Sequence, residues 1–242
     1  MSLAVFVAED LSADTVRLTG AEGRHAAGAK RLRVGEAVEL VDGRGCRARC
    51  VVVEVGRDEV ALTVGKTVQE PQPEPRLVVV QAIPKGDRGE LAVELMTEVG
   101  VDEVVPWAAS RCVVQWRGER GDKALRRWRS TAREAAKQAR RSWIPTVSEP
   151  TTTQQAVART SSAAAVLVLH EAAQEPLAAV ALPERGDVVL VVGPEGGLTD
   201  GELADLDAAG ARLVRLGPTV LRTSTAGAAA AAVVSARSAR WR

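Results

Sequence analysis

Two glycine-bearing loops near the C-terminus constrain the fold more than any other feature of the chain. They read Val192-Gly193-Pro194-Glu195-Gly196-Gly197-Leu198 and Leu216-Gly217-Pro218-Thr219-Val220-Leu221-Arg222-Thr223. Each follows a short apolar run typical of a buried strand, and each precedes a predicted helix. Loops that follow neighbouring parallel strands meet at one edge of a sheet, so we expect a crevice there. The chain lacks a complete Gly-x-x-x-x-Gly-Lys-Ser/Thr phosphate loop and a Gly-x-Gly-x-x-Gly motif, so the crevice is expected to bind its ligand mostly through backbone groups.

The rest of the chain divides into a β-rich part and an alternating part. Residues 1–70 contain short valine-rich runs separated by glycine and aspartate turns, which predicts a small β-barrel. Residues 71–75 read Pro-Gln-Pro-Glu-Pro and form a stiff linker. Residues 76–242 alternate between strand and helix patterns, which predicts an α/β domain with a parallel sheet and helices on both faces. Within this domain we expect a strand at 112–114, a basic helix at 122–140 and a last helix at 223–240.

The two loops resemble the signature loops of the SPOUT methyltransferases. They are most similar to those of the 16S ribosomal RNA uridine-N3 methyltransferases, the RNA small subunit methyltransferase E family. Segments 24–25, 30–36, 94–101 and 138–142 also match that family's pattern, so the resemblance covers nearly the whole chain. It implies a PUA-like barrel over 1–70 and a SPOUT domain over 76–242, whose C-terminal trefoil knot holds S-adenosylmethionine. Ser224 departs from the family, which usually carries glutamate at this position.

The resemblance implies that the methyl donor lies between the two loops and the end of a preceding strand. The residues expected to bind it are Leu169, His170, Glu171, Gly193, Glu195, Gly197, Leu216, Gly217, Pro218, Val220, Leu221 and Thr225. Three of them have a purely structural alternative. Glu195 is able to cap a neighbouring backbone group, Thr225 to cap the last helix, and His170 to act as a hydrogen-bonded polar residue at a strand end.

Arg222 is the candidate catalytic residue. Uridine N3 carries a weakly acidic proton on the Watson–Crick edge, so the target base has to be unpaired. A guanidinium at the end of the second loop would orient the uracil or stabilise the anion left when the proton departs. The alternative is an ion pair between Arg222 and an acid such as Glu195. No residue stands out as the general base, and proton transfer to water is left open.

Positive charge is unevenly distributed, although the net charge is only +1. Residues 111–141 contain eleven Lys/Arg and three Asp/Glu. A solvated helix face would explain them, but such an excess repels itself and favours a polyanion partner. Together with the resemblance, the basic clusters predict phosphate contacts by six residues, namely Arg24, Lys30, Arg31, Arg33, Arg140 and Arg141.

Composition narrows the class of protein. Hydrophobic residues make up 46% of the chain, which is ample for a core, and no apolar run approaches the about 18 residues that span a membrane. Residues 1–10 lack the basic region and the long apolar run of a signal peptide, so a cytoplasmic protein is expected. Three cysteines and two histidines predict neither a disulfide framework nor a metal site.

The family resemblance, with which these features agree, implies a homodimeric enzyme that transfers a methyl group from S-adenosylmethionine to a uridine of 16S ribosomal RNA, either free or in the assembled small ribosomal subunit. The small residues at 226–232 suit a tight knot and dimer interface, and equally an ordinary buried helix. Two rival functions stay open. One is a non-catalytic RNA-binding assembly factor that retains the fold, and the other is a small-molecule nucleotide-binding enzyme that uses the same crevice.

Overall fold

The computed structural model describes residues 3–241 and divides into two compact units. The first unit is Met1–Gln72 together with Ala136–Ile144, and the second is Pro73–Ala135 together with Pro145–Arg242. The division therefore passes through the Pro-rich linker, between residues 72 and 73. The packing of residues 136–144 with the first unit was not expected from the sequence.

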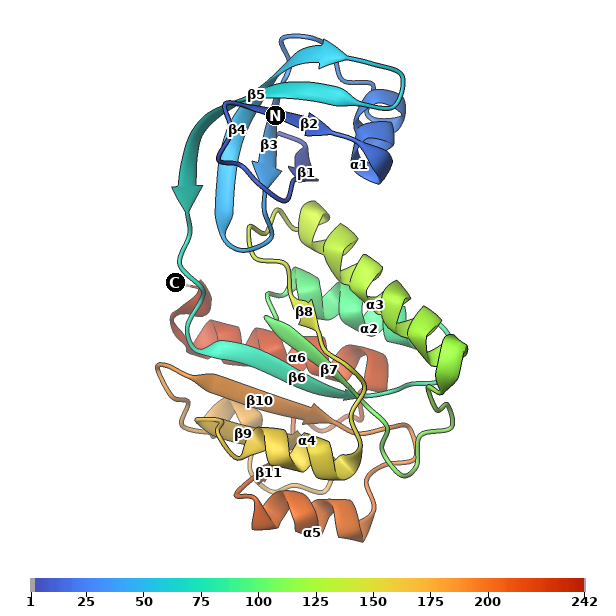
Figure 1. Ribbon diagram of the computed structural model, residues 1–242. Coiled ribbons are helices and arrows are strands. Elements are labelled where there is room, and N and C mark those ends of the chain that lie inside the picture. Colours follow the sequence, from blue (N-terminus) through green and yellow to red (C-terminus); the bar gives the residue numbers. More distant parts are fainter. Residues whose placement is uncertain (1–2, 242) are drawn as a thin grey trace. The chain divides into compact units, whose positions relative to one another are not determined.

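The first unit is built on a curled five-stranded sheet with the order β1-β3-β4-β5-β2 (Figure 1). Strands β1 and β3 pair in parallel, and the other neighbours pair antiparallel. Side chains alternate along β4, where Ala48 and Cys50 are buried and Arg49 and Val51 are exposed, as the two-residue period of a strand requires. The elements are β1 (Val5–Val7), β2 (Thr15–Leu18), α1 (Gly20–Arg24), the π-helical turn η1 (His25–Ala29), β3 (Ala37–Val41), β4 (Cys46–Val55) and β5 (Val60–Gln69).

Residues 136–144 are fixed to the first unit by specific polar contacts. Lys137 Nζ lies 2.9 Å from Glu22 Oε1, and both side chains are almost fully buried. Trp143 Nε1 donates a hydrogen bond to the carbonyl of Glu70 at 3.1 Å. Ile144 packs against the valines of β1. The local sequence does not reveal this docking, because every partner lies more than 70 residues away.

The second unit contains a six-stranded, wholly parallel sheet with the order β11-β9-β10-β6-β7-β8. Its central strands, residues 76–82 and 187–192, are nearly continuous apolar runs because both faces are covered. The prediction of a parallel sheet with helices on both faces is confirmed. The strands are β6 (Arg76–Ala82), β7 (Glu103–Trp107), β8 (Thr146–Val147), β9 (Ala165–Leu169), β10 (Asp187–Val192) and β11 (Arg212–Val214).

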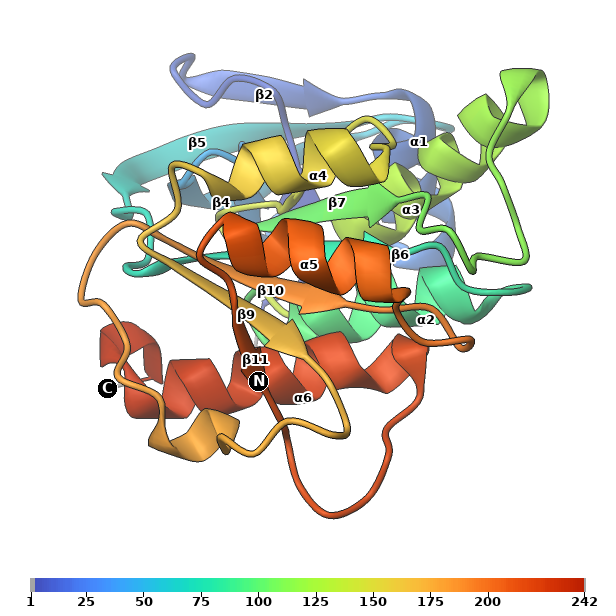
Figure 2. The same cartoon turned by 90° about the horizontal axis from the view of Figure 1, so that it is seen from below.

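Helices form a layer on each face of this sheet (Figure 2). Residues Leu77 and Val79 of β6 share one core with α2, α3 and α6, and their neighbours Val78 and Val80 share the other core with α4 and α5. Two capping boxes start helices on the second face, Thr152 with Gln155 and Thr199 with Glu202. The helices are α2 (Arg88–Glu98), α3 (Gly118–Gln138), α4 (Thr153–Thr160), η2 (Leu177–Ala179), α5 (Asp200–Ala208), α6 (Thr223–Arg237) and η3 (Ala239–Trp241).

Three details of the second unit differ from the sequence-based expectation. Residues 112–114 form no strand, because β7 already has β6 and β8 as neighbours and this segment lies beyond the end of β7. The basic helix α3 starts at Gly118 instead of residue 122. The last helix ends at Arg237 because Ser238 is extended, and Arg240 then donates to Asp102 at 2.7 Å. The trefoil knot stays a prediction.

Candidate functional site

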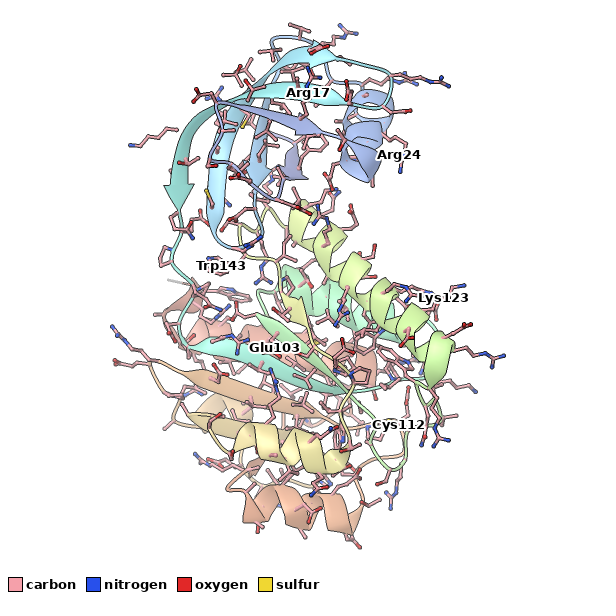
Figure 3. All side chains as sticks on the ribbon, viewed as in Figure 1. Arg17, Arg24, Glu103, Cys112, Lys123 and Trp143 are labelled. Carbon is pink, nitrogen blue, oxygen red and sulfur yellow. The ribbon has the colours of Figure 1, made fainter. Side chains whose placement is uncertain are left out.

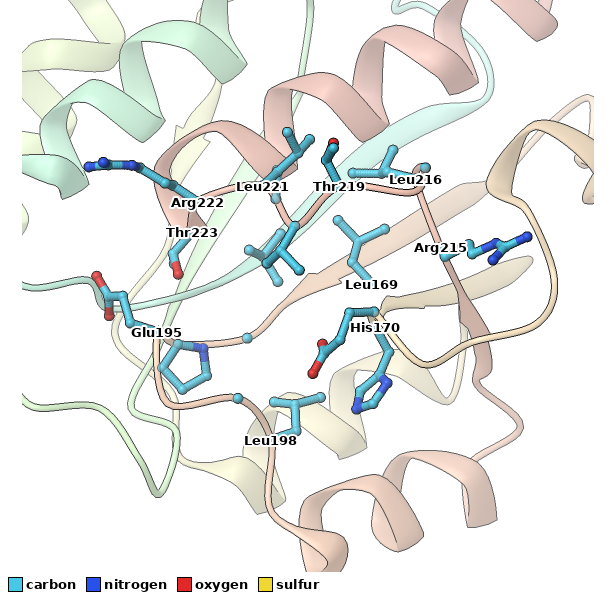
Figure 4. Close-up of a pocket in the computed structure, with 18 of the residues that line it drawn as sticks. Leu169, His170, Glu195, Leu198, Arg215, Leu216, Thr219, Leu221, Arg222 and Thr223 are labelled. Atoms are coloured by element: carbon cyan, nitrogen blue, oxygen red, sulfur yellow. The ribbon is translucent and has the colours of Figure 1, made fainter.

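A pocket lies at the carboxyl ends of three neighbouring strands of the parallel sheet (Figure 4). Leu169 at the end of β9 is in register with Val192 of β10 and with Val214 of β11. The chain leaves each strand as a loop, and the three loops enclose a cavity of about 360 Å³. Parallel pairing therefore turns three segments that are separate in sequence into one site.

The structure gathers most of the predicted donor-binding residues around this cavity. The predicted residues that line it are Leu169, His170, Glu171, Gly193, Glu195, Gly197, Leu216, Gly217, Val220, Leu221 and Arg222. Pro218 and Thr225 are not part of the lining. Thr225 Oγ1 instead donates to the carbonyl of Arg222 at 3.2 Å in the first turn of α6. This is not the predicted cap, because the N-cap residue of α6 is Arg222 and no side chain accepts a hydrogen bond there.

Several lining residues were not predicted from the sequence. They are Arg88, Val192, Pro194, Leu198, Arg215, Thr219, Thr223 and Ala226. Most flank predicted residues in the same loops, so a wider window around each loop would have found them. Arg88 is different, because it starts α2 more than 80 residues upstream. It reaches the pocket because β6 lies beside β10 in the sheet, and strand order is not readable from the chain.

Glu195 is held at the rim of the pocket by the segment that follows β6. Its Oε1 lies 3.4 Å from the backbone nitrogen of Lys85 and 3.9 Å from the guanidinium of Arg88. Arg222 forms no ion pair with any residue from 3 to 241, and its side chain extends outward along the rim (Figure 4). The alternative role of Arg222, an ion pair with Glu195, is thus absent from the described part of the chain, and Arg222 faces solvent beside the cavity.

His170 is hydrogen-bonded within its own loop. Its backbone N–H donates to the carbonyl of Val214 at 2.9 Å, and its Nδ1 accepts from the N–H of Ala172 at 3.2 Å. Nδ1 therefore acts as an acceptor, which leaves Nε2 as the nitrogen that carries the proton in the neutral ring. This arrangement matches the alternative in which His170 is a satisfied polar residue at a strand end.

The pocket suits a ligand with a flat apolar part and polar edges. Leu169, Leu198, Leu216 and Val220 supply apolar contacts, and the two glycine loops supply main-chain donors and acceptors. A Cβ atom placed on Gly217 would meet nothing within 4 Å, so this glycine borders open space. An adenine with its ribose and amino acid substituents fits a site of this size and chemistry. Within residues 3–241, no cluster of three His, Cys, Asp or Glu side chains is arranged to hold a metal ion.

The six predicted RNA-binding residues all belong to the first unit. Arg24, Lys30, Arg31, Arg33 and Arg140 are exposed and Arg141 is half-buried, and Figure 3 shows the Arg24 side chain extending away from α1. Arg31 and Arg140 adopt left-handed backbone conformations with φ of 51° and 55°. Such strain in a non-glycine residue concentrates at functional sites. No helix in residues 3–241 is long and apolar enough to cross a membrane.

Comparisons with known proteins define the class of this chain. Residues 70–235 match the model of an RNA methyltransferase domain, and residues 18–65 match that of an RNA methyltransferase PUA domain. Among curated relatives, ribosomal RNA small subunit methyltransferase E of Mycobacterium bovis is 50% identical over 226 residues, which cover 92% of this chain and 86% of the relative. The enzyme of the same name from Bacillus subtilis is 31% identical, with 88% and 87% covered.

Solved structures show the same likeness. Ribosomal RNA small subunit methyltransferase E from Neisseria gonorrhoeae, bound to S-adenosylmethionine, has a TM-score of 0.88 at 26% identity and covers 97% of this chain and 98% of its own. A methyltransferase from Legionella pneumophila in complex with the same cofactor has a TM-score of 0.87 at 27% identity, with 98% and 99% covered. The chain belongs to the ribosomal RNA small subunit methyltransferase E family. The predicted family and the PUA-like first domain are confirmed.

Proposed function

We propose that this chain methylates N3 of one uridine in 16S ribosomal RNA. S-adenosylmethionine is the cofactor, and when bound it supplies a methyl group on a positively charged sulfur. The observation that carries the proposal is the cavity enclosed by the two glycine loops, in a chain of this family. Backbone groups of the loops, with Leu169, Leu216 and Leu221 around the adenine, would hold the cofactor.

The chemistry at N3 requires a place for negative charge. A uracil that has lost its N3 proton carries that charge on N3 and on the two flanking carbonyl oxygens. Arg222 is a guanidinium at the pocket rim that forms no ion pair among residues 3–241. Donors aimed at developing charge often lower a reaction barrier more than any other interaction does. Glu195 does not neutralise Arg222, because its carboxylate is directed to Lys85 and Arg88. The arrangement supports a direct role for Arg222 in stabilising the anion.

The first unit would position the RNA. It contains the segment matched to the PUA domain of RNA methyltransferases and all six candidate phosphate contacts. Either free 16S ribosomal RNA or the assembled small subunit would serve as substrate, and we expect the reaction in the cytoplasm.

The family resemblance further implies a homodimer and a knotted C-terminus. The less buried side of α6 carries Thr225, Ala229, Ala232 and Ala236. An arginine at one of these positions should disrupt such a dimer, and light scattering would detect the loss.

The test is mass mapping of ribosomal RNA from a strain that lacks the protein, complemented with wild type or with Gly217→Val. Wild type should restore one N3-methyluridine in 16S RNA, and Gly217→Val should not, because its side chain fills the open space of the pocket. Gly201→Val, at an equally open position in α5, is the matched control. Restoration of ribosome assembly by a variant that binds no cofactor would instead support the non-catalytic assembly factor.

A further inference from the structure

Arg111 contacts the first glycine loop, although it lies more than 80 residues upstream of that loop. Its Nη1 donates to the carbonyl of Gly196 at 3.0 Å and to the carbonyl of Leu198 at 3.1 Å. In the sequence, Arg111 is one of the basic residues expected to meet a polyanion. The structure separates it from that group, because its guanidinium is directed to main-chain acceptors of the pocket loop.

The two carbonyls lie on either side of the residue that bends the loop. Gly197 has a φ of +71°, in the left-handed region that favours glycine, and its N–H closes a turn onto the carbonyl of Pro194 at 2.9 Å. One guanidinium bound to the carbonyls of residues 196 and 198 holds this bend from both sides. The stem of Arg111 also packs on Gly196, where an added Cβ would lie 3.2 Å from Arg111 Cβ.

Arg111 is itself held in place by its neighbours. The N–H of Ser110 donates to Glu202 Oε1 at 2.8 Å, and Cys112 is buried with its N–H bonded to the carbonyl of Ala109 at 3.0 Å. Burial alone would raise the pKa of Glu202, but hydrogen bonds from Ser110 and Thr199 lower it. The carboxylate is therefore ionised at neutral pH and anchors the segment before Arg111 to the start of α5.

We propose that Arg111 is a positioning residue of the methyl-donor pocket, which pre-organises residues 193–198 so that their main-chain groups face the cofactor. The inference rests on the proposal that S-adenosylmethionine occupies this pocket. A loop that is already ordered loses less conformational freedom when the ligand binds. Without the guanidinium the loop has to order on binding, so cofactor affinity falls while the chemical step, once the cofactor is bound, changes little.

The experiment compares Arg111→Met with Arg111→Lys and with Arg117→Met. Methionine keeps an unbranched stem and removes both hydrogen bonds, whereas lysine restores a charged donor. Arg117 lies in the same segment, and its side chain donates to Gln115 Oε1 at 2.7 Å. Calorimetry gives the Kd for S-adenosylmethionine, and steady-state methylation separates KM for the donor from kcat. Thermal unfolding reports on the fold.

Arg111→Met should raise the donor Kd and KM by roughly 10- to 100-fold, the range expected for charged hydrogen bonds, with kcat at saturating donor within a few-fold of wild type. Arg111→Lys should recover part of the affinity, and Arg117→Met should leave the donor Kd unchanged. The proposal is overturned if Arg111→Met binds the donor like Arg117→Met, or if it loses RNA affinity alone, which would make Arg111 an RNA contact.

Gly196→Ala provides a second route if Arg111→Met fails to fold. An added Cβ would lie 3.2 Å from Arg111 Cβ and displace the Arg111 stem, so this variant should raise the Kd for the donor. Its effect should not add to that of Arg111→Lys in the double variant, because both changes act on the same contact. Full additivity would contradict the coupling. A wild-type protein that binds S-adenosylmethionine but methylates another RNA position would refute the N3 proposal and leave the Arg111 result valid.

Discussion

At the scale of single residues, two arginines at the pocket rim differ in whether they have an acidic partner, a difference that the sequence alone does not reveal. Arg88 lies 3.9 Å from Glu195, whereas Arg222 has no acidic partner among residues 3–241. A guanidinium without a carboxylate partner keeps its net positive charge available to a bound ligand. Arg222 is therefore the better placed of the two to stabilise a uracil anion, and Arg88 acts mainly on Glu195.

Arg222→Ala should reduce single-turnover methylation at saturating donor by about 10²–10³, the typical loss of one such donor. The Kd for S-adenosylmethionine should stay near that of wild type. Arg222→Lys should recover only part of the rate, because lysine lacks the planar fork of arginine. Methylation by Arg222→Ala within a few-fold of wild type would assign the residue a structural role.

At the scale of elements, close packing between α2 and α3 depends on a glycine. A Cβ on Gly89 would lie 2.7 Å from the indole of Trp128, which is itself buried and packed edge-on against Trp116 with ring centroids 4.8 Å apart. Trp128 thus belongs to the core, and the partly buried Trp116 packs against it. A rigid buried ring cannot move away from an added methyl group as a flexible side chain does.

Gly89→Ala should lower the free energy of unfolding by about 1–2 kcal/mol, because overpacking outweighs the gain in helix propensity. Gly201→Ala in α5, where an added Cβ meets nothing within 4 Å, should be neutral or slightly stabilising. Urea denaturation of the two variants checks both signs. Equal stability of the pair would mean that Trp128 shifts without strain.

Glu103, at the start of β7, links three elements of the second unit. It lies 2.5 Å from Arg76 of β6 and also bonds Arg159 of α4 and Ser148. Burial by itself would raise the pKa of Glu103, but the hydrogen bonds from Ser148 and Arg76 and the charge of Arg159 lower it below its ordinary value of 4.5. A carboxyl with a lowered pKa stabilises the fold above its unfolded-state pKa, and this stabilisation is lost as the pH falls through the folded-state value.

Glu103→Gln should therefore destabilise the protein at pH 7 by ~2 kcal/mol, since two arginines lose their partner. The difference from wild type should shrink as the pH falls below 4.5 and through the lowered folded-state pKa. Chemical denaturation at several pH values measures the difference directly. A constant difference across the whole range would show that the charge of Glu103 contributes nothing to stability.

At the scale of the whole molecule, a net charge of +1 conceals an uneven distribution of charge. Arg17 of the first unit is neutralised by Glu54 at 2.8 Å and Glu59 at 3.2 Å, whereas Arg31 and Arg33 are exposed and form no ion pair among the described residues. Counterion release on RNA binding depends on exposed cations that are not already paired with a carboxylate. The distribution of unpaired arginines thus indicates where the RNA binds better than the net charge does.

Replacing both Arg31 and Arg33 by alanine should reduce the slope of log Kd for RNA against log salt concentration. The expected reduction is about 1.4, at roughly 0.7 per single-strand phosphate contact. Cofactor affinity should not change. Arg17→Ala, the matched control, should leave the slope as in wild type. An unchanged slope in the double variant would exclude these arginines from the RNA interface.

Local patterns in the sequence determined the strand and helix alternation of residues 76–242, the parallel sheet and the two loops of the pocket. They did so because burial on both faces, capping residues and glycine turns act within a few residues of one another. Only the tertiary structure decided that Arg88 lines the pocket, that Arg111 bonds the first glycine loop, that Arg222 has no acidic partner within residues 3–241, and that residues 136–144 join the first unit. These contacts depend on the order of the strands in the sheet and on packing between segments far apart in the chain, which local conformational preferences do not encode.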